Sequence, residues 1–285
     1  MATPWDHPNP RGLAVVQALM RVIVAIQCWG AAAQGLGGQS PSDVARWLFL
    51  ESSFRAAEIL RFDRFVALGL LAAGLVSLVR PMWLALFAAA GWFAAEAAAS
   101  LTRGGEPGAA FVALEHAVWI AAPISLAMLD WWPPKLKFTL GRFVFALGLL
   151  RWTAATSLAA QGAKQLWSLG ERTRLEELVS RSLTAAHAAD GTPEQIPLAM
   201  GALAGADIAI ALLLAATRSR SVACLAGAWC LARIAMWTLA FGPEGYPETL
   251  VRAALPGAPL VLAAFAFIGT RVAPPEILPQ PAPPK

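Results

Sequence analysis

The sequence predicts an all-α integral membrane protein with eight transmembrane helices, arranged as two four-helix repeats that each carry an interfacial helix after the first span. Three observations predict this fold class. Of the 285 residues, 58% are AVILMFWYC and a further 23 are Gly, whereas soluble domains are about half apolar on the same count. Charged residues make up only 14% of the chain, against about 25% in soluble domains. Finally, the apolar residues form long runs, and the order of these runs repeats.

This composition excludes a soluble enzyme, a nucleic-acid-binding protein and a disordered chain as descriptions of the whole sequence. A water-soluble fold of this size could not bury so much apolar surface. The net charge of +4 does not alter this conclusion, because the Lys and Arg residues are spread over many short loops and form no basic face for phosphates. We therefore expect the lipid bilayer as a partner, and no nucleic acid.

Eight apolar stretches are long enough to cross about 30 Å of hydrocarbon. They lie near residues 15–36, 62–79, 82–101, 109–129, 139–160, 196–216, 222–241 and 250–269. Polar-rich segments follow the first and fifth stretches, at residues 37–61 and 164–194, and mix charges with apolar side chains as interfacial helices do. The predicted divisions are a cytoplasmic N-terminal segment, two four-helix repeats and a Pro-rich C-terminal tail, at residues 1–11, 12–132, 133–271 and 272–285.

The two predicted repeats share motifs at a nearly constant offset, which indicates an internal duplication. Residues 32–35 (AAQG) at the end of the first span match residues 159–162 at the end of the fifth. Trp92 of the third span matches Trp229 of the seventh at an offset of 137 residues. Because each repeat has an even number of spans, we expect the two to be related by rotation about the membrane normal.

The distribution of charge predicts the orientation. Basic residues dominate the loops on the side of the N-terminus, at Arg11, Arg80, Lys135, Lys137, Arg142, Arg218, Arg220 and Arg271. Nearly all the carboxylates outside the spans lie on the opposite side. By the positive-inside rule, both termini are predicted to be cytoplasmic, in a bacterial-type inner (plasma) membrane, and both interfacial segments are predicted to face outward.

Seven ionisable residues fall inside the predicted spans, where a charge is costly and therefore points to a role. They are Glu96, Glu115, His116, Arg151, Asp207, Arg233 and Arg252. Arg151 and Asp207 lie at a similar depth, roughly 16–21 Å from the cytoplasmic ends at about 1.5 Å per residue. Since neither should remain unpaired in hydrocarbon, we expect them to form an ion pair between adjacent spans.

The duplication sharpens the interpretation of these residues, because it places Glu96 opposite Arg233 and His116 opposite Arg252. One interpretation is a polar cavity in the outer half of the bundle that binds a polar head group or relays protons. The other is a network of ion pairs that joins the two repeats, and polar groups between spans commonly have this role. Both interpretations stay open at this point.

The motifs of catalysis and cofactor binding are missing from the sequence. There is no nucleotide-binding loop, no HExxH and no metal-ligand cluster. His116 is the single histidine within the spans, which argues against a bis-histidine haem. The cysteines, Cys28, Cys224 and Cys230, lie in apolar runs without CxxC spacing and predict neither disulfides nor a metal site. We expect no intrinsic cofactor and no metal.

Two short motifs carry a family resemblance. Residues 141–149, which begin with Gly-Arg and end with Gly-Leu, are followed by residues 162–166 (GAKQL). With four spans per repeat and a polar interruption after the first, this pattern resembles the DoxX-like membrane family. The resemblance implies a four-helix bundle in each half and an association with redox enzymes, since the family includes the small membrane subunit of thiosulfate:quinone oxidoreductase. It also implies that Asp207 lies near a position where such proteins often have Glu, and that quinone or lipid is bound.

Two functions from different classes follow. The first is a non-catalytic accessory or scaffold subunit of a larger membrane complex, with respiratory or other redox subunits as the expected partners. The second is a quinone-linked oxidoreductase subunit, or a carrier of a small anion or lipid head group, that uses the charges within the membrane. The absence of a recognisable nucleophile, metal site or nucleotide loop favours the first and argues against an enzyme.

Overall fold

A computed structural model describes residues 10–37, 41–51, 54–102, 107–130, 132, 139–169, 174–185 and 195–268. Within these ranges the regular structure is helical, apart from an isolated bridge between Met82 and Trp132. Most of the predicted N-terminal segment and the whole Pro-rich tail lie outside the described residues. The predicted all-α class is therefore confirmed for the part of the chain that the structure describes.

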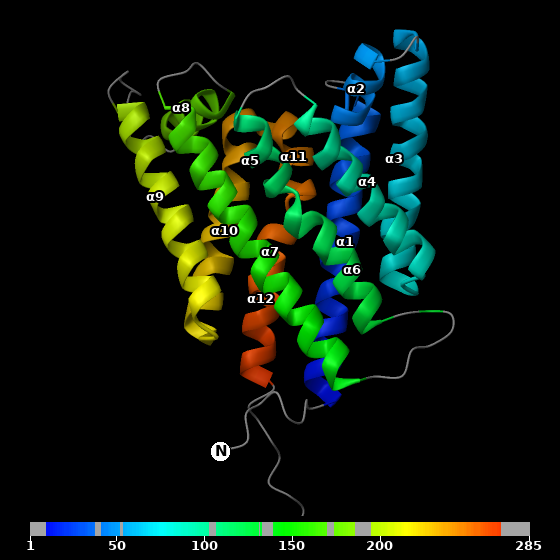
Figure 1. Cartoon of the computed structure of the whole chain (residues 1–285), viewed down its shortest axis with the longest axis vertical. Coiled ribbons are helices and arrows are strands. Elements are labelled where there is room, and N and C mark those ends of the chain that lie inside the picture. Colours follow the sequence, from blue (N-terminus) through cyan, green and yellow to red (C-terminus); the bar gives the residue numbers. More distant parts are fainter. Residues whose placement is uncertain are drawn as a thin grey trace, which may run out of the picture.

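The helices follow the predicted order of spans. The first half contains α1 (Pro10–Gly37), α2 (Asp43–Glu51), α3 (Ala56–Val79), α4 (Trp83–Leu101), α5 (Pro107–Glu115) and α6 (Ala117–Leu129). The second half contains α7 (Leu140–Trp167), α8 (Arg174–Ala185), α9 (Gln195–Ala216), α10 (Arg220–Phe241), the 3-10 turn η1 (Gly242–Gly245), α11 (Tyr246–Val251) and α12 (Ala254–Ile268). Figure 1 shows the long helices side by side, with α2, α5, α8 and α11 gathered at the upper end of the bundle and with the start of α1 and the end of α12 at the lower end.

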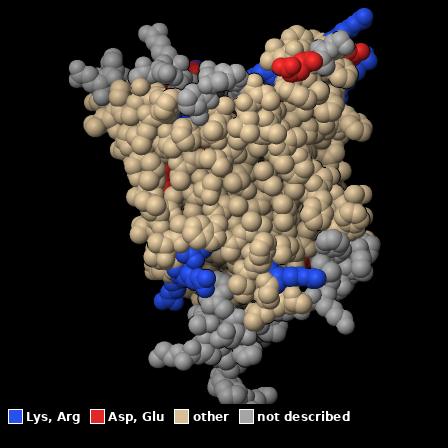
Figure 2. All heavy atoms as spheres, viewed as in Figure 1, with Lys and Arg blue, Asp and Glu red and all other residues tan. Residues whose placement is uncertain are grey.

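Length and composition identify a multi-pass membrane protein. Seven helical stretches are long and apolar enough to cross a bilayer. The face in Figure 2 carries a broad band of uncharged side chains, with Lys and Arg at the lower edge and both signs of charge at the upper edge. The predicted eighth span differs, because a turn at Arg252 divides it into α11 and the shorter apolar stretch Ala254–Phe267.

The predicted fourth span is also divided, at His116 between α5 and α6. Inside α6, Pro123 has no N–H to donate to the carbonyl of Trp119 four residues earlier. The side chain of Gln27 on α1 donates to that carbonyl oxygen instead, over 2.9 Å. A buried carbonyl needs such a partner, so this hydrogen bond both satisfies the proline site and ties α6 to α1.

Helix contacts in the second half follow the same order as those in the first. α3 packs against α1 and α9 against α7, whereas α2 lies on α3 and α4 and α8 lies on α9 and α10. Glycines permit the closest approaches. A Cβ atom at Gly35 would lie 3.0 Å from the Cβ of Ala67 on α3, and one at Gly162 would lie 2.8 Å from the carbonyl oxygen of Ala204 on α9.

The arrangement of α8 and α10 leads to a labelling prediction. Thr184 on α8 and Ser219 before α10 are both exposed, and α9 separates them by the thickness of the apolar band. We expect single cysteines at these positions to react with a membrane-impermeant maleimide from opposite sides of oriented vesicles. The variants Thr184→Cys and Ser219→Cys are compared in a background in which Cys224 is Ala. Labelling of both from one side would contradict this topology.

Candidate functional site

A cavity of about 910 Å³, which we call the main cavity, lies at the end of the bundle that carries α2, α5 and α11. Helices α1 to α6 form one side of it, and α7, α8, α10 and α11 close the other. Its titratable lining residues are Asp43, Arg46, Asp63, Glu96, Glu115, His116, Lys164, Glu248 and Arg252. Its aromatic lining residues are Trp92, Phe93, Trp119, Trp167 and Trp237. Its volume is within the range of small-molecule sites, about 300–1,000 Å³.

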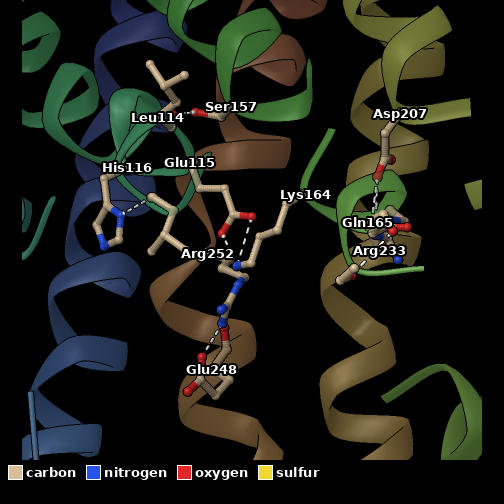
Figure 3. Close-up of polar contacts among 12 residues, drawn as sticks. Leu114, Glu115, His116, Ser157, Lys164, Gln165, Asp207, Arg233, Glu248 and Arg252 are labelled. Atoms are coloured by element: carbon tan, nitrogen blue, oxygen red, sulfur yellow. Dashed lines mark hydrogen bonds and ion pairs between the residues drawn. The ribbon is translucent and has the colours of Figure 1, made fainter. Parts of the chain in front are cut away.

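One side of the main cavity holds an ion pair between the two halves of the chain. Lys164 Nζ on α7 lies 3.2 Å from each carboxylate oxygen of Glu115 on α5, and Figure 3 shows the two side chains meeting. Both side chains are only partly exposed. Lys164 belongs to the GAKQL motif, and the pair therefore places this motif at the cavity wall.

Arg252 occupies the turn between α11 and α12, beside this pair. Its guanidinium pairs with Glu248 one helical turn earlier and also donates to the Glu248 carbonyl oxygen over 2.9 Å. The guanidinium carbon lies 5.6 Å from the ring centroid of Trp119 and 4.4 Å from that of Trp237. Two aromatic faces thus stabilise the cation in addition to the carboxylate.

His116 lies at the break between α5 and α6, packed edge-on against Trp119 with the ring centroids 4.3 Å apart. Its Nδ1 is 2.8 Å from the carbonyl oxygen of Val112. Because a carbonyl only accepts, Nδ1 carries the proton in this hydrogen bond and Nε2 of the neutral ring is left as an acceptor.

Two carboxylates hold the start of α2 over the cavity. Asp63 on α3 accepts hydrogen bonds from the backbone N–H and the hydroxyl of Ser42, over 3.1 and 2.5 Å. Glu96 on α4 accepts from the backbone N–H of Asp43 and Val44, over 3.0 and 3.5 Å. Free N–H groups and the positive end of the helix dipole make a helix start favourable for carboxylates.

Two of the other predicted site residues, Asp207 and Arg233, form a second cluster, which lies apart from Glu115 and Lys164 in Figure 3. Asp207 on α9 is fully buried and accepts from Arg233 over 3.1 Å, from Trp229 over 2.6 Å and from Gln165 over 3.2 Å. This arrangement joins α7, α9 and α10 within the second half.

The predicted ion pair between Arg151 and Asp207 is wrong. Arg151 Nε and Nη2 donate to the carbonyl oxygens of Leu214 and Ala215, each over 2.6 Å, at the last turn of α9. Equal backbone depth does not make two side chains meet, because a long arginine side chain extends along the helix toward a more polar level. There it satisfies carbonyls that have no partner within α9.

The polar cluster predicted from sequence is therefore divided among three places: the main cavity, the Asp207 cluster and, for Arg151, the end of α9. Four of its residues line the main cavity: Glu96, Glu115, His116 and Arg252. Lys164, Glu248 and Asp63 were not among the predicted site residues, because they lie near the ends of the predicted spans. The signal for Lys164 was its place in the GAKQL motif, and the signal for Glu248 was its spacing of four residues from Arg252.

Beside Gln161 and Arg233 in the second half, the space is much smaller. A cavity of about 40 Å³ lies there, lined by residues that include Gln161, Lys164, Arg233 and Arg252. Arg233 stands where the predicted alignment puts Glu96, and its ion pair with Asp207 helps to fill the space. The two halves thus differ in their capacity for a ligand.

Comparison with known proteins gives no relative: no protein-family model, curated protein or solved structure matches this chain. Among the described residues, no group of three His, Cys, Asp or Glu side chains is placed to hold a metal ion. What the main cavity offers is a polar and aromatic compartment, in which charged groups are held in place by ion pairs and helix N–H groups.

Proposed function

We propose that the chain is an accessory membrane subunit that binds a small amphipathic molecule in the main cavity. The observation that carries this proposal is the cavity itself, about 910 Å³ in volume and lined by both charged and aromatic side chains. An amphipathic molecule suits such a wall, because its apolar part can contact the tryptophans while its polar part reaches the charges. The proposed role is to hold the molecule, without chemistry of its own.

We further propose eight membrane crossings in two related four-helix units. The matching helix contacts of the two halves support this. So do the breaks at His116 and Arg252, each followed seven residues later by a proline inside the next helix, at Pro123 and Pro259. The start of α1 and the end of α12 lie at the same end of the bundle, as an even number of crossings requires.

Orientation and location are part of the same proposal. Arg80, Arg142, Arg218 and Arg220 lie at the ends of α3, α7, α9 and α10 that are opposite the main cavity. By the positive-inside rule, this end faces the cytoplasm of a bacterial-type cell and the main cavity faces outward. A ligand would then reach the cavity from the outer surface or from the outer leaflet.

The resemblance to DoxX-like proteins supplies the proposed partners, which are integral membrane subunits of redox enzymes, with quinone or lipid as candidate occupants of the cavity. Lys164, in the motif on which the resemblance depends, pairs with Glu115 at the cavity wall. This placement supports a link between the motif and the site. The scaffold role remains a prediction, and gentle extraction followed by sizing and mass spectrometry of co-migrating proteins tests it.

Filling the main cavity should remove the bound molecule. Val112 lines the cavity on α5, whereas Leu114 on the same helix is exposed on the outer surface. We expect Val112→Trp to lose a small molecule that the wild type and the control Leu114→Trp retain through gentle purification. Organic extracts of the three proteins are compared by mass spectrometry. Equal extracts from all three would contradict ligand binding in this cavity.

A further inference from the structure

The lining of the main cavity carries more negative than positive groups. Five carboxylates line it, those of Asp43, Asp63, Glu96, Glu115 and Glu248. Three cationic side chains line it, those of Arg46, Lys164 and Arg252. The lining thus has two more carboxylates than cationic side chains. In a bundle surrounded by lipid, an uncompensated charge is costly, and a cationic ligand would reduce that cost.

The excess lies on the side of the first half. Glu115 and Glu248 are each paired with a cation, as described above. Within the described ranges, by contrast, Asp63 and Glu96 accept from Ser42 and from backbone N–H groups, and no Lys or Arg forms an ion pair with either. A carboxylate has about four lone-pair positions, so both keep acceptor capacity.

Asp63 and Glu96 bind neighbouring residues and so form one acidic cluster. Asp63 binds Ser42 and Glu96 binds the next residue, Asp43, so both carboxylates lie against one turn of the chain at the start of α2. Glu96 lies four residues after Trp92 on α4, which puts the carboxylate and the indole ring on the same face of the helix. Trp92 also lines the main cavity.

His116 adds a hydrogen-bond acceptor to the wall of the main cavity. Its side chain is only 7% exposed and lines the main cavity. Nε2, the acceptor nitrogen of its ring, has no hydrogen-bond partner within the described part of the chain. Nε2 is not among the fully buried atoms that lack a partner, so it can accept from water or from a ligand with N–H or O–H groups in the cavity.

Aromatic faces in the same cavity already hold one cation. Arg252 lies over the rings of Trp119 and Trp237, which shows that the wall is compatible with cation–π contacts. Trp92 and Trp167 are further indole rings in the lining. Aromatic rings combined with carboxylates are the usual surroundings of bound organic ammonium groups.

We propose that the main cavity binds an organic cation, an amine or quaternary ammonium group on an apolar body. Its charge lies beside Asp63 and Glu96, and its apolar part contacts Trp92. This inference rests on the proposed function and names the ligand class for the same cavity. The ammonium group could belong to a free amine or to a lipid head group, because the recognising chemistry is the same.

Three probes of nearly equal shape test the proposal: choline, its neutral isostere 3,3-dimethylbutanol and the anion 3,3-dimethylbutyrate. Binding to the purified full-length protein in a phosphatidylglycerol nanodisc is measured by calorimetry. We expect choline to bind at least roughly tenfold more tightly than the neutral isostere, since only the cation is attracted by the carboxylates and by the faces of the indole rings. In a phosphatidylcholine nanodisc, a lipid-head-group site shows weaker apparent choline binding through competition, whereas a site for a free amine shows no change.

Substitutions of Asp63 and Glu96 test whether the bound cation lies beside these two carboxylates. Glu96→Gln and Asp63→Asn keep the shape of the side chain and remove its charge, and each is expected to weaken choline binding roughly tenfold. The control Glu244→Gln removes a carboxylate in the exposed turn η1, outside the main cavity, and should leave binding unchanged. The wild-type comparison of the three probes remains decisive if a variant fails to fold.

Equal binding of choline and its neutral isostere, preference for the anion, or binding of none of the three probes would overturn the cation proposal. The proposed function is judged separately, by the small molecule that wild type and Leu114→Trp retain and Val112→Trp loses. If that molecule is present and is neutral or anionic, the main cavity is a ligand site of another class. If it is absent from all three proteins, the proposed function fails as well.

Discussion

Replacing Asp207 with alanine is expected to lower the free energy of unfolding by about 3–5 kcal/mol, the usual cost of removing one partner of a buried ion pair. The side chains of Asp207 and Arg233 are only 0% and 8% exposed. Without the carboxylate, the guanidinium would keep the sulfur of Met236 as its one remaining partner among the described residues. The N–H groups of Trp229 and Gln165 would also lose their acceptor.

The double variant Asp207→Ala, Arg233→Met should recover much of this loss, because no uncompensated charge is left in the bundle. Equilibrium unfolding in mixed micelles is measured for the wild type, Asp207→Ala, Arg233→Met and the double variant. Glu177→Ala is the control, since its pair with Arg181 is about half exposed and such pairs contribute roughly 0–1 kcal/mol. Losses that simply add in the double variant would show that the two side chains do not act as a pair.

Gly30→Ala is expected to be the second strongly destabilising change, because it separates α1 from α11. A Cβ atom at Gly30 would lie 2.2 Å from the backbone nitrogen of Val251 and 2.6 Å from the carbonyl carbon of Leu250. Backbone atoms cannot rotate away as a side chain can, so one helix must move. Overpacking of this kind costs about 1–3 kcal/mol and occasionally more, and we expect a loss near 3 kcal/mol.

The same change should disturb the main cavity, since α11 and the turn after it carry Glu248 and Arg252. We expect Gly30→Ala to retain less of the co-purifying molecule as well as to unfold more easily. Gly69→Ala is the matched control, because a Cβ atom at Gly69 meets no atom within 4 Å. Helix propensity alone should then make that variant more stable, by up to about 1 kcal/mol. Equal stabilities of the two variants would contradict the close contact.

The sequence by itself determined the class of the protein and the order of its helices. Runs of apolar residues report directly on which segments can lie in hydrocarbon, and their length is set by the thickness of the bilayer. The short helices α2 and α8 lie within the two polar-rich segments, as expected from their mixed composition. The break in the predicted fourth span was not anticipated, since the run of apolar residues there is continuous apart from Glu115 and His116.

The sequence also showed that charges inside the spans need partners, but only the tertiary structure decided which partners they have. Arg233 forms the ion pair with Asp207, whereas Arg151 donates to carbonyl oxygens at the end of α9. A position along a helix axis specifies depth and leaves open both the rotation of the helix and the reach of a long side chain. Those two quantities depend on how neighbouring helices pack.

The main cavity, too, was decided only by the tertiary structure. Its walls come from both halves of the chain: Glu96 binds the start of α2 at the main cavity, whereas Arg233 pairs with Asp207 beside the much smaller cavity. The charges within the predicted spans left two alternatives, a polar cavity or a network of ion pairs between the repeats. In the structure four of these residues line a cavity, and the Asp207–Arg233 pair lies within the second half. The physical reason is that a void is a property of packing between helices, which no single segment of sequence specifies.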